Sequence, residues 1–176
     1  MRQPSSRWTR KAAGSSDAKT VEAAAVRMLA RREHSTEELR RKLLAKGHPP
    51  EAIEPVIEKL AGKRLVSDDR FTASFVHHHA KRGQGPVRIR GALRQQGITD
   101  SQADEALRCA GVDWVQLARE VRRRKFGAAA PRSLGERAKQ ARFLQYRGFD
   151  AEQLRAAFHD ESGEGEYAPD ITPEAE

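Results

Sequence analysis

The chain of 176 residues has few of the residue types that build covalently linked or membrane-bound structures. Cys109 is its single cysteine, which excludes an internal disulfide and a zinc site made of several cysteines. No segment approaches the roughly 20 consecutive apolar residues that cross a bilayer. The N-terminal charges precede no apolar segment of the kind found in secretory signal peptides. We therefore expect a cytoplasmic protein with no membrane partner.

Signatures of enzymes are also scarce. The turn Gly83–Gly85 lacks the third glycine of a dinucleotide-binding loop, and the chain has no phosphate-binding P-loop motif. Asp68 and Asp69 open a predicted helix, where carboxylates usually serve as caps. The run His77–His79 spreads its rings about 100° apart on a helix, so the three do not converge on one metal ion. With Cys109 expected in a core, we predict no catalytic residue, no cofactor and no metal site.

Charge is what the chain has in excess. Its 33 basic and 25 acidic residues give a net charge of +8 and a pI of about 10.1. Residues 70–99 contain six basic residues and no acidic one, and residues 119–147 contain ten basic and two acidic residues. Residues 160–176 contain seven acidic residues and no basic one. A basic body of this kind favours a polyanionic partner.

The sequence between the two ends predicts helices only. Alanine, leucine, arginine and glutamate dominate, and no alternating β-branched run of strand length occurs. Possible capping boxes begin at Ser35, Thr99 and Asp150. The predicted helices are 18–33, 36–46, 50–61, 68–82, 86–96, 100–109, 113–126, 134–147 and 150–159. The fold class is all-α.

An internal repeat underlies these helices. Gly47, Gly97 and Gly148 follow predicted helices at separations of 50 and 51 residues, and Leu43, Leu93 and Leu144 each lie four residues earlier. A glycine at a helix end favours a left-handed residue, and the leucines are expected at equivalent core positions. We predict three tandem three-helix repeats, 18–66, 67–112 and 113–159, in an elongated, curved array. A disordered arm, 1–17, and an acidic disordered tail, 160–176, flank them, and a monomer is expected.

The basic residues are the candidate binding residues. A helix starting at Pro86, with free N–H groups and nearby arginines, is expected to hold phosphate or carboxylate groups. Similar cations occur in the first and third repeats. The candidate residues for binding a filament or a nucleic acid are Arg27, Arg31, Arg32, Lys81, Arg82, Arg88, Arg90, Arg94, Arg122, Arg123, Arg124 and Lys125.

Several motifs resemble one bacterial family. The segment 29–35 with Glu38-Leu39 is similar to the opening motif of RecX regulatory proteins, and Asp68–Phe71 with Gly83–Pro86 resembles their central motif. Arg147–Phe149 is similar to their third-unit ending. The resemblance covers roughly residues 18–159 and implies tandem three-helix units that bind in the groove of the RecA–DNA filament. It implies inhibition of ATP hydrolysis, strand exchange and filament growth, and hence roles in DNA recombination, DNA repair and the SOS response.

Two alternatives remain open. Because each repeat is trihelical, the chain also fits a helix-turn-helix-like DNA-binding transcription factor. A nuclease is a weaker candidate, since no cluster of carboxylates for metal-assisted hydrolysis is evident. Free DNA, single- or double-stranded, is expected to bind weakly and without sequence specificity. The acidic tail is expected either to cover the basic third repeat or only to be solvated.

Overall fold

The computed structural model describes residues 7–159, and every regular element among them is an α-helix. Residues 1–6 and the predicted acidic tail, 160–176, lie outside the described residues. None of the described helices is long and apolar enough to cross a membrane. The first unit contains α1 (Arg7–Leu29), α2 (Thr36–Ala45) and α3 (Pro50–Gly62). The second contains α4 (Asp68–Lys81), α5 (Pro86–Gln95) and α6 (Asp100–Cys109). The third contains α7 (Trp114–Phe126), α8 (Leu134–Arg147) and α9 (Ala151–Phe158).

Helix starts follow the predicted capping residues with one difference. Thr99 and Asp150 both form capping boxes with the glutamine three residues later. Ser35 also caps its helix, because its hydroxyl accepts from the backbone N–H of Glu38 at 3.0 Å. The Glu38 carboxylate, however, does not return to the cap: it is paired with Arg32 and Lys42. The expected capping box at Ser35 is therefore only half formed.

The repeat is visible in the backbone at the end of each unit's second helix. Gly47, Gly97 and Gly148 have φ values of +82°, +78° and +92°, the left-handed conformation that glycine adopts readily. The N–H of the following residue bonds back to the carbonyl of Leu43, Leu93 or Leu144 in turn. This is the hydrogen bond of a Schellman helix end. The predicted equivalence of the three segments is confirmed.

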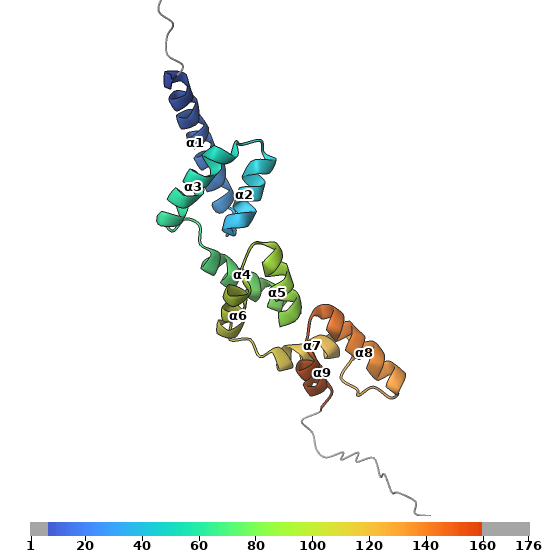
Figure 1. The fold of residues 1–176 in the computed structure, drawn as a ribbon. Helices are drawn as coiled ribbons and strands as arrows, with labels where there is room; N and C mark the ends of the chain where they lie inside the picture. The colour runs from blue at the N-terminus through green and yellow to red at the C-terminus, as the bar shows by residue number, and fades with distance from the viewer. Residues whose placement is uncertain (1–6, 160–176) are drawn as a thin grey trace, which may run out of the picture.

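Each unit has its own hydrophobic core. Leu43, Leu93 and Leu144 are fully buried, each in a different one of three separate clusters. The main helix contacts are within units, and Figure 1 shows the units following one another along an elongated body. The all-α array of three-helix units is confirmed. One boundary differs: α1 begins at Arg7, so residues 7–17 are helical where a disordered arm was expected.

Two polar joints connect the units. At the first joint, the Ser35 hydroxyl donates to the carbonyl of Gln96 at 2.7 Å, and the Thr36 N–H donates to the Asp68 carboxylate at 2.7 Å. The N-terminus of α2 therefore meets the end of α5.

The second joint repeats this arrangement one unit further along. The N–H groups of Gly85 and Val87 donate to the carbonyls of Arg147 and Gly148 at 2.9 and 3.1 Å. The N-terminus of α5 thus meets the end of α8. A side chain at Gly148 would collide with Arg88, because its Cβ would lie 2.6 Å from the Arg88 backbone nitrogen. Close backbone contact at this joint therefore requires glycine.

Candidate filament and nucleic-acid interface

Two of the N–H groups at the start of α5 already have partners within the chain. The sequence predicts exposed N–H groups there, but the carbonyls of Arg147 and Gly148 occupy those of Gly85 and Val87. The end of α8 thus satisfies donors that would otherwise be available to a phosphate. The expectation of free N–H groups is therefore wrong for Gly85 and Val87, and the reason is a contact between segments that are distant in the sequence.

Three candidate arginines are paired inside the chain. Arg90 and Arg94 lie one turn apart, as predicted, but they face α6, where Arg90 pairs with Asp104 and Arg94 lies 2.7 Å from Asp100. Arg32 is paired with Glu38 across the first unit. Each of these arginines therefore has a carboxylate beside it that competes with a polyanion, although residues 70–99 contain no acidic residue of their own.

Arg122 is a structural residue. It is only 4% exposed, and its Nη1 donates to the carbonyl of Ala129 and the amide oxygen of Gln140, both at 3.4 Å. It lies one turn after Ala118, which is fully buried. Helical spacing from Ala118 is the sequence signal that separates Arg122 from its exposed neighbours Arg123, Arg124 and Lys125.

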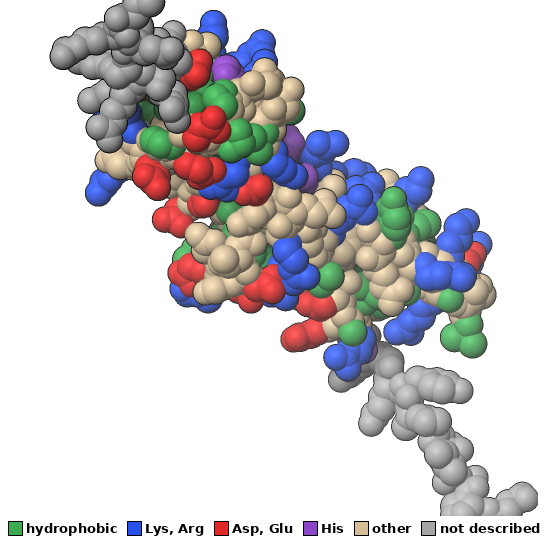
Figure 2. Space-filling model, turned by 45° about the horizontal axis from the view of Figure 1, so that its top comes forward, with side chains coloured by type: hydrophobic (Ala, Val, Ile, Leu, Met, Phe, Trp, Pro, Cys, Tyr) green, Lys and Arg blue, Asp and Glu red, His purple; other side chains and the backbone are tan. Residues whose placement is uncertain are grey.

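The remaining candidates near the second joint are exposed. Lys81, Arg82 and Arg88 form no salt bridge with any carboxylate of the described residues, and neither do Arg124 and Lys125. The same holds for the four basic residues of α8, which the candidate set omits, namely Arg137, Lys139, Arg142 and Arg147. Figure 2 shows Lys and Arg side chains gathered toward the end of the molecule that holds the third unit, with most acidic side chains elsewhere.

A group of four residues at the second joint is called the joint cluster. It consists of Arg82, Arg88, Tyr146 and Arg147. The Arg88 guanidinium donates to the carbonyl of Tyr146 at 3.0 Å and lies 5.1 Å from the centre of its ring. Arg147 donates to the carbonyl of Arg82 at 3.2 Å and lies 5.2 Å from the ring of Phe143. Two guanidinium groups are therefore fixed at the surface by carbonyls and aromatic rings rather than by carboxylates.

A second basic region lies on the first unit. Arg27 and Arg31 of the candidate set line a hollow of about 550 Å³ with Lys42 and Lys46, and no carboxylate lines it. Lys42 lies in α2 and Lys46 directly follows it. The sequence alone did not indicate these two lysines, because only the packing of α1 against α2 brings them beside α1. Lys42 also lies 3.0 Å from Glu38, which partly neutralises it.

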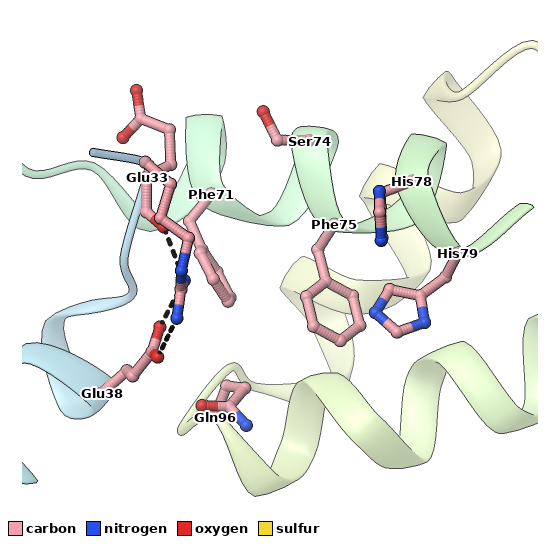
Figure 3. A pocket seen from close by; sticks show the side chains of 9 residues that line it. Glu33, Glu38, Phe71, Ser74, Phe75, His78, His79 and Gln96 are labelled. Carbon is pink, nitrogen blue, oxygen red and sulfur yellow. Dashed lines mark hydrogen bonds and ion pairs between the residues drawn. The ribbon is translucent and has the colours of Figure 1, made fainter. Parts of the chain in front are cut away.

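A pocket of about 450 Å³ lies between the first two units and is lined by residues of both (Figure 3). Phe71, Phe75 and His79 come from α4, and Glu38 lies on the opposite side. Glu38 is paired there with Arg32. His79 stacks on Phe75 with ring centres 3.9 Å apart, and its Nδ1 lies 2.7 Å from the amide oxygen of Gln84. Burial lowers the pKa of His79, which favours the neutral ring.

The other two histidines of the run and the cysteine are at the surface. His77 and His78 are exposed, so the three rings do not converge, as helical geometry predicts. Cys109 is exposed as well, which contradicts its expected core position. Its Sγ lies 3.2 Å from the Glu105 carboxylate, and this contact raises the pKa of the thiol. A raised pKa disfavours the reactive thiolate.

Glu38 is the most strongly perturbed acid of the pocket. Burial alone would raise its pKa, but hydrogen bonds from Arg32 and Lys42 and the charges around it lower the pKa to about 2. His34 is buried beside it, with Nδ1 2.9 Å from the carboxylate, and burial lowers the pKa of His34. The pair is therefore an ionised glutamate and a neutral histidine near neutral pH.

Comparison with known proteins gives the same three units. Residues 23–60, 67–107 and 112–158 match the family models for the first, second and third three-helix domains of RecX. The chain is 51% identical over 137 residues to a protein named Regulatory protein RecX from Halorhodospira halophila, covering 78% of this chain and 85% of that one. It is 46% identical over 134 residues to Regulatory protein RecX of Pseudomonas fluorescens, covering 76% of this chain and 86% of that one.

Solved structures show the same fold. The crystal structure of RecX from Lactobacillus salivarius superposes with a TM-score of 0.70 at 21% identity, covering 81% of this chain and 95% of that one. A second crystal structure, of regulatory protein RecX, gives 0.73 at 23% identity, covering 88% of this chain and 77% of that one. From its three matched domains and its close named relatives, we conclude that the chain belongs to the RecX family of regulatory proteins.

Proposed function

We propose that the chain binds in the groove of the RecA–DNA filament and inhibits ATP hydrolysis, strand exchange and filament growth. The observation that carries this proposal is the distribution of charge: exposed cations gather toward the third unit of an elongated array, and a second group lies on the first unit. A groove between protein subunits and a DNA backbone would accept such a body lengthwise. The charged end would then face phosphate groups, since cationic surfaces attract polyanions. This role belongs to DNA recombination, DNA repair and the SOS response in the cytoplasm.

The helix-turn-helix alternative fits less well. A recognition helix enters the major groove and contacts base edges, and the last helix of a trihelical unit usually does this. The last helices of the first two units are acidic: α3 carries Glu51, Glu54 and Glu58, and α6 carries Asp100, Asp104 and Glu105. In the third unit, α9 carries only Glu152. Carboxylates along α3 and α6 would be repelled by the DNA phosphates.

ATP hydrolysis by preformed RecA–DNA filaments tests the proposal. We expect the hydrolysis rate to fall as the chain is added, and to fall less at high salt, because screening weakens contacts between exposed charges and phosphates. An unchanged rate at a several-fold excess of chain over RecA would refute the proposal. RecA without DNA provides the background rate.

A further inference from the structure

Tyr146 is an aromatic side chain at the surface without an evident packing role. It is 73% exposed, whereas Leu144, two residues earlier on α8, is fully buried. The exposed residue one turn before it on the helix is Arg142, so a cation shares its side of α8. Isolated exposed apolar residues are common. Tyr146, however, is contacted by Arg88 and lies one helical turn from Arg142.

The ring is held by the second joint. Arg88 donates to the carbonyl of Tyr146 and places its guanidinium 5.1 Å from the ring centre, so that it covers one face. The joint itself is fixed by the backbone bonds from Gly85 to Arg147 and from Val87 to Gly148. Tyr146 is thus held at a hydrogen-bonded joint, and most of its surface is still accessible to a ligand.

The ligand must combine a flat π-surface with negative charge. A second aromatic ring would stack on the accessible part of the tyrosine, and anionic groups would reach Arg82, Arg88 and Arg142, none of which has a carboxylate partner among residues 17–159. An unpaired nucleotide has both features. A paired one does not, because its base is enclosed in the duplex stack and only its phosphates face outward.

We propose that Tyr146 is a stacking platform for an unpaired base of single-stranded DNA, with Arg82, Arg88 and Arg142 contacting the adjacent phosphates. The platform gives the chain a preference for single strands over duplexes that a purely cationic surface would not have. It deepens the proposed function and rests on it only in taking nucleic acid as the partner of this region.

Fluorescence anisotropy of a labelled oligonucleotide, without any recombinase, tests the platform. We expect Tyr146→Ala to weaken binding of a single strand about 5-fold or more, the usual range for loss of one base–aromatic stack. Binding of a duplex of equal length should not change. Tyr146→Phe, which keeps the ring, should bind both as the wild type does. Leu134→Ala is the matched control, because Leu134 is 86% exposed on the same helix.

Three results would overturn the platform. The first is equal single-strand binding by Tyr146→Ala and the wild type, including the case in which neither binds. The second is an equal loss for single strand and duplex, which would mean a contact to phosphate only. The third is a loss in Tyr146→Phe as large as in Tyr146→Ala, which would assign the effect to the hydroxyl. Circular dichroism confirms that each variant is folded.

Photocrosslinking gives a readout that does not depend on affinity. A single strand carrying 5-iodouracil should crosslink to Tyr146, and mass spectrometry identifies the crosslinked residue. Crosslinks confined to other residues would contradict the proposal.

Adding the Tyr146→Ala variant to RecA filaments separates the platform from the proposed function. Reduced inhibition with unchanged single-strand binding would identify Tyr146 as a protein contact, which overturns the platform but leaves the proposed function standing. If the wild-type chain binds single strands through Tyr146 but does not inhibit RecA, the proposed function is overturned and the platform stands.

Discussion

At the scale of single residues, the same backbone conformation serves two purposes. Gly47 and Gly148 both end a helix with a positive φ, +82° and +92°. A Cβ added at Gly47 would meet nothing within 4 Å, whereas one at Gly148 would collide with Arg88. The first glycine is needed only for its conformation, and the second also for the contact between units.

The two glycines make a matched pair of variants. We expect Gly47→Ala to destabilise the fold by about 1–2 kcal/mol, the cost of a left-handed non-glycine residue. Gly148→Ala should cost more, because Arg88 and the joint must also move. Chemical denaturation followed by circular dichroism measures both. Equal losses would show that the joint tolerates a side chain.

Leu93 tests the repeat at its centre. It is fully buried in the core of the second unit. Truncation to alanine should cost about 2–5 kcal/mol, as expected for a leucine in a packed core. A loss below about 1 kcal/mol would contradict the assigned core position.

Glu38 makes stability depend on pH. Its pKa is about 2 in the folded chain, below its ordinary 4.5, so folding favours the ionised form. That contribution is complete above the ordinary pKa and is lost as the pH falls from about 5 toward 2. The lowered pKa of His34 also makes the fold less stable as the pH falls, because His34 binds a proton more readily in the unfolded chain than in the folded chain.

Glu38→Gln isolates this contribution. The variant should be less stable than the wild type at pH 7 by roughly 1–3 kcal/mol, and the difference should shrink between pH 5 and pH 3. Denaturation midpoints at pH 7, 5 and 3 provide the measurement. A difference that stays constant over this range would mean that the Glu38 carboxylate does not titrate as assigned.

At the scale of helices, the side chains of neighbouring helices determine whether an arginine is paired with a carboxylate or available to a polyanion. Arg90 and Arg94 of α5 face carboxylates of α6, whereas Lys81 and Arg82 at the end of α4 have none among the described residues. The double variants Lys81→Gln/Arg82→Gln and Arg90→Gln/Arg94→Gln remove the same charge. We expect the first to weaken binding to DNA and inhibition of RecA more than the second. Equal effects of the two would show that only net charge matters.

The sequence predicts the helices well because their boundaries depend on local chemistry. Caps at Thr99 and Asp150 and left-handed glycines at Gly97 and Gly148 act within a few residues, so they are visible in the chain itself. Leucine spacing likewise predicts the three cores.

Contacts between distant segments are not visible in this way. The carbonyls of α8 that occupy the start of α5, and the aspartates of α6 that pair with Arg90 and Arg94, come from elements that only folding brings together. For this reason the candidate site was harder to predict than the fold. The burial of Arg122 was predictable from its helical spacing, whereas the exposed Tyr146 has no distinct sequence pattern.

At the scale of the whole molecule, the three units follow one another along an elongated body (Figure 1). Each unit has its own core, and hydrogen bonds and close backbone contacts connect neighbouring units. The two joints have the same arrangement: the end of one unit's second helix meets the start of the second helix of the preceding unit. Such an array is long and presents different surfaces along its length. A filament is a partner that can contact all of them at once.

Co-sedimentation with RecA–DNA filaments tests the central proposal most directly. With filaments held by an ATP analogue that RecA does not hydrolyse, the account predicts saturable pelleting of the chain, at fewer than one chain per RecA subunit because an elongated body spans several subunits. The Lys81→Gln/Arg82→Gln variant should require more filament to pellet. A pellet holding no more chain than DNA alone carries down would contradict the account.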